Sequence, residues 1–263
     1  MSQVDAIVPA GGYGKPEDPL YPLVKDGPKA MLPVAGKPMI QWVLDALGGS
    51  VRVGQVVVVG LPPDTGLTCG GKPVHYVPNA GSMVANARAG LNRLAKLNPA
   101  STCALWASAD IPGVRPEHVD WLVDTCLQTD DDIYYCVIER AVMEARYPAS
   151  RRSYTRLKEM TVCGGDMNMF SMRLARGVHP LWEQITEARK NVFKQAALFG
   201  FEPLWLLLTR QLTARRAEEL VEKRLNVRAR LIVCPYAEIG MDVDKPFQYE
   251  IVVKDLEGRA AKG

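Results

Sequence analysis

The sequence predicts a three-layer α/β/α fold built around a mostly parallel sheet. Short apolar runs rich in valine and isoleucine alternate with stretches whose apolar residues recur every three to four positions, which indicates strands alternating with helices. Residues 56–59 are four consecutive valines, as is typical of a strand covered on both faces in a parallel sheet. The 263 residues contain no internal repeat or low-complexity segment, so we expect a single domain over residues 1–263.

The expected strands are short. They lie at residues 6–8, 56–59, 74–77, 103–107, 133–138, 167–172 and 231–234. Ligands of such sheets bind beyond the carboxyl ends of the strands. The residues that follow strands 6–8 and 103–107 are therefore the first candidates for a site.

Four stretches show helical spacing. Gly36-Lys37-Pro38 opens the first, because proline suits the first helical turn and residues 40, 43, 44 and 47 share one face. Ser82 is expected to cap the second, whose apolar positions are 84, 87, 91 and 94. A third face comprises residues 119, 122, 123 and 126, and the chain is expected to be helical between about residues 179 and 225. Residues 15–28 are polar and rich in proline, which predicts an exposed loop without helix.

The composition excludes several classes of protein. A net charge of +3 is too small to indicate a nucleic-acid surface, although it suits a small anionic substrate. The N-terminus lacks the features of a signal peptide, and no apolar run approaches the roughly 20 residues of a membrane span. The six cysteines include no C-x-x-C pair, and the three histidines have no ligand spacing, which favours reduced thiols and argues against zinc. We expect a cytoplasmic protein.

The residues after the first strand, Pro9-Ala10-Gly11-Gly12-Tyr13-Gly14, form a glycine-rich loop. Glycine lets the backbone approach a ligand closely, and backbone N–H groups can cradle phosphate oxygens. A dinucleotide-binding fingerprint would need glycine at Glu17, and a P-loop would need serine or threonine where Pro16 follows Lys15. On its own, the loop is equally compatible with a tight turn.

The residues downstream favour the phosphate-binding interpretation. The loop is followed by Lys29-Ala30-Met31-Leu32-Pro33-Val34-Ala35-Gly36-Lys37-Pro38-Met39-Ile40. A glycine loop, then a lysine, a short apolar segment and Gly-Lys-Pro before a helix resembles the MobA-like nucleotidyltransferases. The resemblance implies a Rossmann-like fold of the nucleotide-diphospho-sugar transferase type. Residues 1–115 would form the nucleotide-binding half and residues 116–263 the acceptor-binding half.

The resemblance also implies the reaction, which is transfer of a nucleoside monophosphate from a nucleoside triphosphate to a phosphorylated acceptor with release of pyrophosphate. It assigns nucleotide binding to the loop residues Ala10, Gly11, Gly12 and Gly14. It makes Lys29 a catalytic contact of the triphosphate, where a lysine offsets the charge of the departing pyrophosphate. The arginine that the family usually has after the loop is absent here. Lys15 stands near its position, followed by an insert of residues 16–28 that is a candidate for a mobile lid.

A second segment, Asn79-Ala80-Gly81-Ser82, leads into the predicted second helix. In the family a Gly-Ser helix start at this point helps to recognise the base and the sugar. The resemblance therefore implies that Asn79, Gly81 and Ser82 bind the nucleotide. A simple helix cap is the alternative, and both roles are compatible because a helix N-terminus offers free N–H groups.

Three aspartates are candidates for a metal site. Asp110 follows strand 103–107 in a D-x-P segment, and Asp242 and Asp244 lie in Gly240-Met241-Asp242-Val243-Asp244-Lys245-Pro246. Mg²⁺ is usually bound by one or two carboxylates together with substrate phosphates. The resemblance implies that Asp110 is a catalytic ligand of Mg²⁺ and that Asp242 or Asp244 is the second. A turn-capping aspartate and a solvated charged turn are the alternatives.

Candidates for acceptor binding lie between these motifs. The family has a glycine-containing segment near the acceptor, which implies Gly164 and Gly165. Arg151, Arg152 and Lys190 are basic residues that can bind a phosphate, although each is also compatible with an exposed surface position. The apolar stretch of residues 196–208 is expected to pack on its own domain or to form a homodimer contact, with a lipid surface as the alternative.

The sequence leaves the base and the acceptor open. GTP and CTP are both candidate donors, and molybdopterin, sugar phosphates and polyol phosphates are candidate acceptors. Two other functions are alternatives: a nucleotide-sugar-dependent glycosyltransferase of related fold, which would lack the Lys29 motif, and a non-catalytic regulatory domain that binds a nucleotide. Release of pyrophosphate separates the three.

Overall fold

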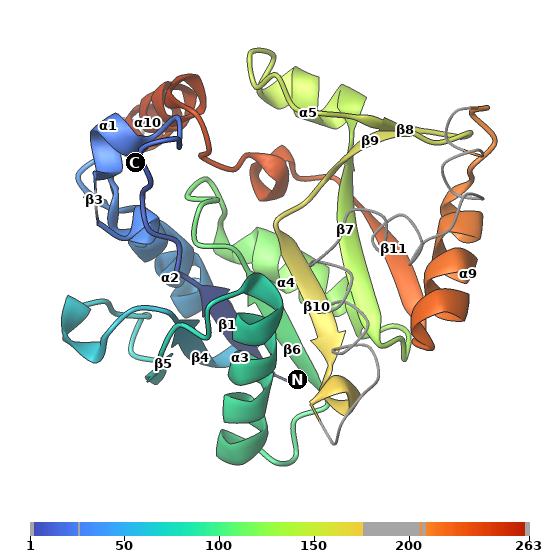
Figure 1. Ribbon diagram of the computed structural model, residues 1–263, viewed down its shortest axis with the longest axis horizontal. Helices are drawn as coiled ribbons and strands as arrows, with labels where there is room; N and C mark the ends of the chain where they lie inside the picture. Colours follow the sequence, from blue (N-terminus) through green and yellow to red (C-terminus); the bar gives the residue numbers. More distant parts are fainter. Residues whose placement is uncertain (1–2, 26, 176–205, 207–208, 261–263) are drawn as a thin grey trace.

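A nine-stranded sheet forms the centre of the molecule in the computed structural model, which describes residues 3–25, 27–175, 206 and 209–260 (Figure 1). The strands follow the order β5-β4-β1-β6-β10-β7-β9-β8, and β11 also pairs with β7. Their bounds are β1 Val4–Pro9, β4 Val53–Val59, β5 Val74–Val77, β6 Cys103–Ala107, β7 Ile133–Glu139, β8 Thr155–Arg156, β9 Thr161–Gly164, β10 Met167–Ser171 and β11 Ala229–Cys234. The two short strands β2 (Pro33–Val34) and β3 (Lys37–Pro38) form a separate hairpin.

Seven of these nine strands run in the same direction. β1 is parallel to β4 and β6, β4 is parallel to β5, and β7 is parallel to β11. β10 lies antiparallel between β6 and β7, and β9 is antiparallel to β7 and β8. The predicted mostly parallel sheet is confirmed.

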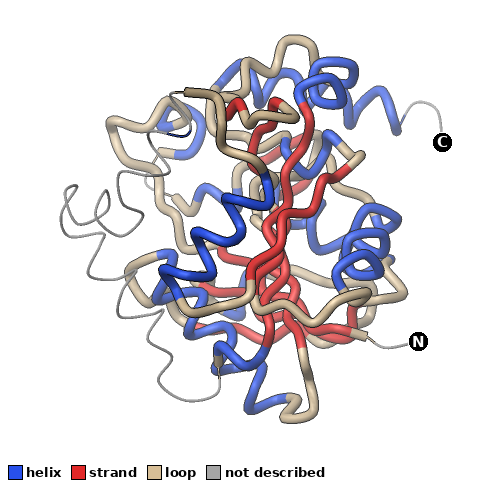
Figure 2. Tube along the Cα trace, turned by 90° about the vertical axis from the view of Figure 1, so that its right-hand side faces the viewer, coloured by secondary structure: helices blue, strands red, loops and turns tan. Residues whose placement is uncertain are grey.

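Helices cover both faces of the sheet, as Figure 2 shows. Their bounds are α1 Tyr21–Val24, α2 Met39–Gly49, α3 Met83–Leu97, α4 Pro116–Cys126, α5 Arg140–Arg146, α9 Ala214–Leu225 and α10 Pro246–Ala260. On one face β1 presents Ala6 and Val8 to a core that includes α2 and α4, and on the other it presents Ile7 to Leu91 and Leu94 of α3. Alternate residues of the strand are thus buried on opposite faces, which explains the unbroken apolar runs and confirms the three layers.

Some element boundaries differ from the prediction. The helix expected to open at Gly36-Lys37-Pro38 begins at Met39, because Pro38 is its N-cap and the residues before it turn back as the β2-β3 hairpin. Residues 15–28 are not purely loop, since they contain the one-turn helix α1 with proline in its first turn, where the missing N–H would have had no helical partner.

The excursion of residues 15–28 is closed at its base. The Gly14 N–H donates to the Gly27 carbonyl at 3.1 Å, and the Lys29 N–H donates to the Gly12 carbonyl at 2.8 Å. A Cβ on Gly14 would lie 2.2 Å from the Lys25 carbonyl oxygen, so only glycine permits this crossing. The chain therefore leaves the glycine loop and returns to it at nearly the same place.

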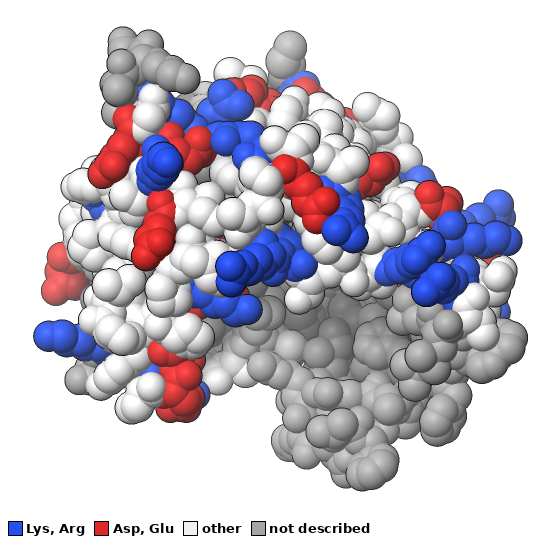
Figure 3. All heavy atoms as spheres, turned by 90° about the horizontal axis from the view of Figure 1, so that it is seen from above, with Lys and Arg blue, Asp and Glu red and all other residues white. Residues whose placement is uncertain are grey.

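The helical stretch expected between about residues 179 and 225 lies mostly outside the described residues, as does the apolar stretch 196–208. Within the described part, α9 is helical as expected. All six cysteines are free thiols. No described helix is long and apolar enough to cross a membrane. Acidic and basic side chains are interspersed over the face of the molecule in Figure 3.

Candidate active site

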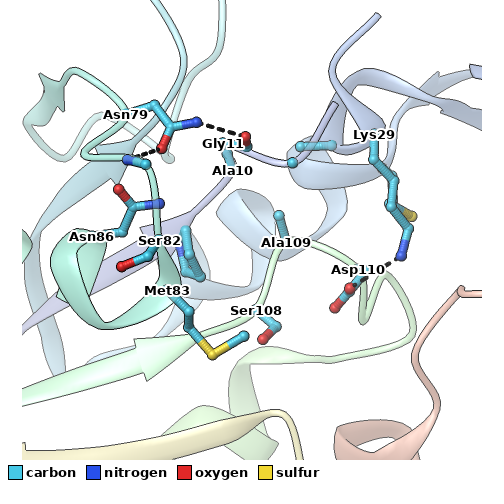
Figure 4. Close-up of a pocket in the computed structure, with 15 residues that line it drawn as sticks. Ala10, Gly11, Lys29, Asn79, Ser82, Met83, Asn86, Ser108, Ala109 and Asp110 are labelled. Carbon is cyan, nitrogen blue, oxygen red and sulfur yellow. Dashed lines mark hydrogen bonds and ion pairs between the residues drawn. The ribbon is translucent and has the colours of Figure 1, made fainter. Parts of the chain in front are cut away.

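A pocket of about 430 Å³ lies beyond the carboxyl ends of β1 and β6 (Figure 4). Its wall is formed by the loop after β1, the short helical turn Lys29–Met31, the loop before α3 and the segment after β6. The lining residues are Pro9, Ala10, Gly11, Gly12, Lys29, Ala30, Met39, Asn79, Gly81, Ser82, Met83, Asn86, Ser108, Ala109 and Asp110. The structure therefore brings together the predicted glycine loop, lysine, helix start and first aspartate.

Close approach of backbones shapes the glycine loop. A Cβ on Gly11 would lie 2.8 Å from the Asn79 side chain. Gly60, which has a φ of +106°, would place a Cβ 2.3 Å from the Gly11 Cα. Within the described residues, the N–H groups of Gly11 and Gly12 make no hydrogen bond. These two donors can therefore bind a ligand in the pocket.

Two asparagines hold the loop before α3. The Asn79 amide donates to the Gly11 carbonyl at 2.8 Å and accepts from the Gly81 N–H at 2.9 Å. The Asn86 oxygen accepts from the Ala80 N–H at 2.7 Å. Because a backbone N–H can only donate, this bond fixes the amide orientation of Asn86 and leaves its NH₂ group facing the pocket (Figure 4).

The predicted nucleotide contacts at this loop divide into two kinds. Gly81 and Ser82 line the pocket, and the Ser82 hydroxyl also caps α3 by accepting from the Ala85 N–H at 3.1 Å. Asn79 lines the pocket too, but both ends of its amide are occupied by the backbone contacts described above. Asn86 was not singled out from the sequence. A polar residue on an otherwise apolar helix face was the available signal.

Lys29 joins the glycine loop to the two aspartate motifs. Its Nζ lies 3.5 Å from an Asp110 carboxylate oxygen and forms an ion pair with Asp244. The Val243 N–H donates to the Asp110 carbonyl at 2.9 Å, which fixes the two aspartate segments against each other. Residues far apart in the sequence thus meet at Lys29, which lines the pocket.

Asp242 lies on the other side of this group. Its carboxylate forms an ion pair with Arg152 and accepts from the Gln248 amide at 3.4 Å. The same Gln248 side chain accepts from the Asp244 N–H at 3.1 Å. Only 13% of the Asp242 side chain is exposed, against 54% for Asp244, so Asp242 faces inward and Asp244 faces the solvent side.

A fourth carboxylate, Asp166, was not anticipated from the sequence. Its backbone is held between β6 and η4 (Ala237–Gly240), because its N–H donates to the Ile239 carbonyl and its carbonyl accepts from the Ser108 N–H, both at 2.9 Å. Its carboxylate lies 3.6 Å from Arg152. An aspartate directly after Gly164-Gly165 was the available signal.

Burial and mutual repulsion perturb these carboxylates. Burial raises the pKa of Asp110 above its ordinary value, and Asp244 adds to the effect against the opposing Lys29. Burial, followed by Asp110 and Asp242, raises the pKa of Asp166 to about 8. Burial also raises the pKa of Asp242 to about 6. The carboxylates therefore lack enough positive charge to ionise freely.

The lysine and the outer aspartate respond in the opposite way. Burial lowers the pKa of Lys29, but Asp110 and Asp244 outweigh it and the pKa lies above the ordinary value. Burial raises the pKa of Asp244, but its hydrogen bond from Lys29 outweighs that and the pKa is lowered. Lys29 is thus a firmly charged ammonium group next to the pocket.

The residues present fit a divalent cation. Two cations, Lys29 and Arg152, face four carboxylates, so the formal net charge of the six side chains is −2. The carboxylates are those of Asp110, Asp166, Asp242 and Asp244. One oxygen of Asp110 is buried and has no hydrogen-bond partner among the residues that the structure describes. Within the described residues no three His, Cys, Asp or Glu side chains could hold a metal by themselves. That is compatible with Mg²⁺, which takes one or two carboxylates and completes its shell with phosphates and water.

Three predicted residues lie elsewhere or play another part. Lys15 is exposed and does not line the pocket, because the chain turns away there, with the Lys15 N–H donating to the Asp18 carboxylate at 2.9 Å. Arg151 stacks over the Phe247 ring at 5.2 Å rather than facing the carboxylates. Gly14 lies outside the pocket and belongs to the base of the 15–28 excursion.

The predicted acceptor residues are only partly placed at the carboxylates. Arg152 is there, and its guanidinium donates to the Gly164 carbonyl at 3.2 Å. Gly165 is buried, and a Cβ there would lie 3.0 Å from the Ile138 side chain and 3.1 Å from the Cys136 sulfur. A side chain at this position would therefore be packed tightly against Ile138 and Cys136. Lys190 lies outside the described residues.

The sequence and the fold both have known relatives. Residues 6–225 match the model of the MobA-like NTP transferase domain, which confirms the resemblance predicted from the motifs. A segment of 136 residues is 34% identical to the 2-C-methyl-D-erythritol 4-phosphate cytidylyltransferase of Bordetella petrii. That match covers 46% of this chain and 53% of the relative, so the chain spans about half the length of the curated relative.

Solved structures share the fold. A hypothetical transferase from Thermus thermophilus has a TM-score of 0.80 and 31% identity, covering 94% of this chain and 99% of that one. A CMP:2-keto-3-deoxy-manno-octonic acid synthetase in complex with CTP has a TM-score of 0.58 at 16% identity, covering 98% and 100%. At that identity the second match shows the fold alone. The predicted fold class is confirmed.

Proposed function

The chain belongs to the MobA-like NTP transferase family of nucleotidyltransferases, and we propose that it transfers a cytidylyl group from CTP to a small phosphorylated acceptor. The observation that carries the proposal is the position of Lys29, which is paired with Asp110 and Asp244 directly beside the unpaired N–H groups of Gly11 and Gly12. The choice of CTP is supported by the 34% identical relative, which is named a cytidylyltransferase of a 4-phosphate.

The pocket has two chemically different ends, which gives the nucleotide a direction. At one end Lys29 and the N–H groups of the glycine loop suit the triphosphate. At the other end, which Gly81 and Ser82 also line, the NH₂ group of Asn86 suits the base (Figure 4). The exocyclic oxygen and the ring nitrogen N3 of cytosine are acceptors that an NH₂ donor can recognise.

We expect Mg²⁺ to be required, with Asp110 and Asp242 as its carboxylate ligands. The inward position of Asp242 and the unpartnered oxygen of Asp110 support this choice. Asp244 is assigned to holding Lys29, with which it is paired. A bound Mg²⁺ would neutralise charge on the triphosphate during the displacement.

The side chains need only position and neutralise the reactants. An acceptor phosphate is already ionised near neutral pH, so no side chain has to remove a proton from the nucleophile. Its oxygen forms a new bond to the α-phosphorus of CTP while the bond from that phosphorus to the α,β-bridging oxygen breaks. Pyrophosphate leaves with the bonding electron pair, and Lys29 stabilises the negative charge that develops on it.

The test is Mg²⁺-dependent release of pyrophosphate from each of the four ribonucleoside triphosphates against a panel of sugar, polyol and pterin phosphates. We expect release from CTP with one class of acceptor. Asp110→Asn should lower kcat by at least about 10²-fold, the usual cost of losing a group that stabilises the transition state. Asp64→Asn, at an exposed aspartate outside the pocket, is the matched control.

Two results would contradict the proposal. Release from another triphosphate would overturn the choice of CTP but not the reaction. Full activity of the folded Asp110→Asn protein would overturn the role of Asp110.

A further inference from the structure

Arg152 is a mostly buried arginine that pairs with two of the four carboxylates of the site, Asp166 and Asp242. It lies in the loop between α5 and β8 and forms an ion pair with Asp242. Its guanidinium also lies 3.6 Å from the Asp166 carboxylate and donates to the Gly164 carbonyl at 3.2 Å. Only 14% of the side chain is exposed. This arginine therefore faces the site rather than the solvent.

The guanidinium group still has hydrogen-bonding capacity to spare. Its partners Asp242, Asp166 and Gly164 are all reached by the two terminal nitrogens. The Nε–H of Arg152 is buried and has no partner in the described structure. Leaving a buried donor without a hydrogen-bond partner is unfavourable. A ligand with several acceptor oxygens, such as a phosphate, would satisfy this edge of the planar fork.

Arg152 and a divalent cation would compete for the same carboxylate. Asp242 is the inward aspartate that we assign to Mg²⁺, and in the free protein its negative charge is neutralised by Arg152. A second, doubly charged cation at Asp242 would repel the guanidinium at short range, where few water molecules screen the interaction. The guanidinium must then move to another anion or remain without a counter-charge.

We propose that Arg152 is an exchangeable phosphate ligand. In the free protein it neutralises Asp242, and when a divalent cation occupies Asp110 and Asp242 it turns to bind the phosphate of the acceptor. This inference rests on the proposed function, because it takes the acceptor to be phosphorylated. It makes Arg152 a substrate-binding residue that becomes available only after the cation is bound.

The exchange has a signature that a purely structural arginine would not have. Removing Arg152 frees Asp242 for the cation and at the same time removes the phosphate ligand. Cation affinity should therefore rise while phosphate affinity falls. A residue that merely holds the loop in place would weaken both when it is removed. By linkage, bound phosphate should also tighten the cation in the wild-type protein.

The first measurement is a titration with Mn²⁺ alone. The electron paramagnetic resonance signal of the free ion reports how much Mn²⁺ remains unbound. We expect Arg152→Gln to bind Mn²⁺ about tenfold more tightly than the wild type, as for a typical coupling energy between two ligands. Arg140→Gln is the matched control, because Arg140 is an exposed arginine in an ion pair with Glu144. Unchanged or weaker Mn²⁺ binding in folded Arg152→Gln would overturn the exchange.

The second measurement is calorimetric binding of inorganic phosphate to protein saturated with Mn²⁺ and α,β-methylene-CTP, which fills the nucleotide pocket without reacting. We expect at least about tenfold weaker phosphate binding in Arg152→Gln, the loss typical of a charge-assisted contact. Arg152→Lys keeps the charge but not the fork, so its Mn²⁺ affinity should stay near that of the wild type and its phosphate affinity should be intermediate. Equal phosphate binding in the wild type and Arg152→Gln would overturn the phosphate role.

The two proposals can fail separately. If α,β-methylene-CTP does not bind to the wild type, the assignment of CTP is wrong, and the titration with Mn²⁺ alone still decides whether Arg152 and the cation compete. If the analogue binds and neither affinity depends on Arg152, the proposed function stands and the exchange does not.

Discussion

Asn86 shows how a single backbone contact determines what a side chain can recognise. Its oxygen is held by the Ala80 N–H, which leaves the NH₂ group for the pocket. An aspartate at the same position could still accept from Ala80, but it would present an acceptor to the base instead of a donor. The loop would keep its hydrogen bond to residue 86, but the group that faces the pocket would change from a donor to an acceptor.

We therefore predict that Asn86→Asp raises KM for CTP by about tenfold or more, since a polar group that faces a mismatched partner costs about 1–3 kcal/mol. Its kcat should change much less, because the contact is the same in the bound substrate and in the transition state. Steady-state kinetics with CTP measures both constants. Asn92→Asp, at an exposed position of the same helix, should leave KM unchanged. An unaltered KM in Asn86→Asp would remove Asn86 from base recognition.

Individual side chains were predictable where a short motif contains them. Lys29, Asp110 and Ser82 could be singled out because they lie in short motifs that resemble those of the MobA-like nucleotidyltransferases, and the structure places all three around one pocket. Arg152 and Asp166 depend on contacts with residues about 90 and 70 positions further along the chain, Asp242 and Ile239. Spacing within one sequence does not report such contacts, so the pairing of Arg152 and the position of Asp166 required the structure.

The close packing of α3 on β1 depends on Gly90, a residue of the helix that has no side chain. A Cβ on Gly90 would lie 2.7 Å from Cγ2 and 3.1 Å from Cδ1 of Ile7, which is fully buried in β1. β-Branched Ile7 has little rotational freedom with which to move aside. The helix can approach the strand this closely only with glycine, and the start of the same helix forms one wall of the pocket.

Gly90→Ala should accordingly destabilise the protein, although alanine is the better helix former by about 1 kcal/mol. Overpacking of a core contact typically costs about 1–3 kcal/mol, so we expect a net loss in the free energy of unfolding, measured by urea denaturation. Gly258→Ala on α10 is the matched control, because a Cβ there would meet no atom of the described residues within 4 Å. It should be neutral or stabilising, and a stabilised Gly90→Ala protein would contradict the packing argument.

At the level of elements, the predicted strands were the most accurate part. Residues 74–77 and 103–107 were predicted with the bounds that β5 and β6 have. The hairpin β2-β3, the strands β8 and β9 and the helices α5 and α10 were missed. The two-residue strands are too short to show a periodic pattern, and they form through pairing with a neighbouring strand.

Taken as a whole, the molecule collects more negative than positive charge at one site while its overall charge stays near neutral. This imbalance destabilises the folded protein, because some carboxyl groups stay protonated in the folded state at pH values at which they are ionised in the unfolded state. The pKa of Asp166 is raised to about 8 and that of Asp242 to about 6, against about 3.9 for an unfolded aspartate.

The metal-free protein should therefore lose stability as the pH rises from 6.5 to 8. In this window the folded state holds protons that the unfolded state has already released, so the free energy of unfolding falls with increasing pH. Below pH 6.5 the buried His118 has the opposite effect, because its pKa is lowered to about 4 and its contribution to the free energy of unfolding increases with pH. Urea denaturation at pH 6.5, 7.2 and 8 measures the slope.

Asp166→Asn removes the carboxyl group whose pKa is raised to about 8, so the free energy of unfolding should depend less on pH between 6.5 and 8. Asp64→Asn should leave this pH dependence unchanged. Adding Mg²⁺ should also flatten it, because the cation supplies the charge that the protons supplied. A slope that is the same in the wild type and in Asp166→Asn would show that Asp166 does not hold a proton in this range.

The 15–28 excursion is closed at its base, so its length does not by itself determine where Lys29 lies. The bonds Gly14–Gly27 and Gly12–Lys29 fix the two ends of the excursion next to each other, so whatever the chain does between them, Lys29 returns to the same place. Residues can therefore be inserted at an exposed turn of this stretch, whereas Leu20, which is 2% exposed and belongs to the core, must stay. The position of Lys29 would stay the same in such variants, so the excursion is a place where related sequences can differ in length without moving this residue.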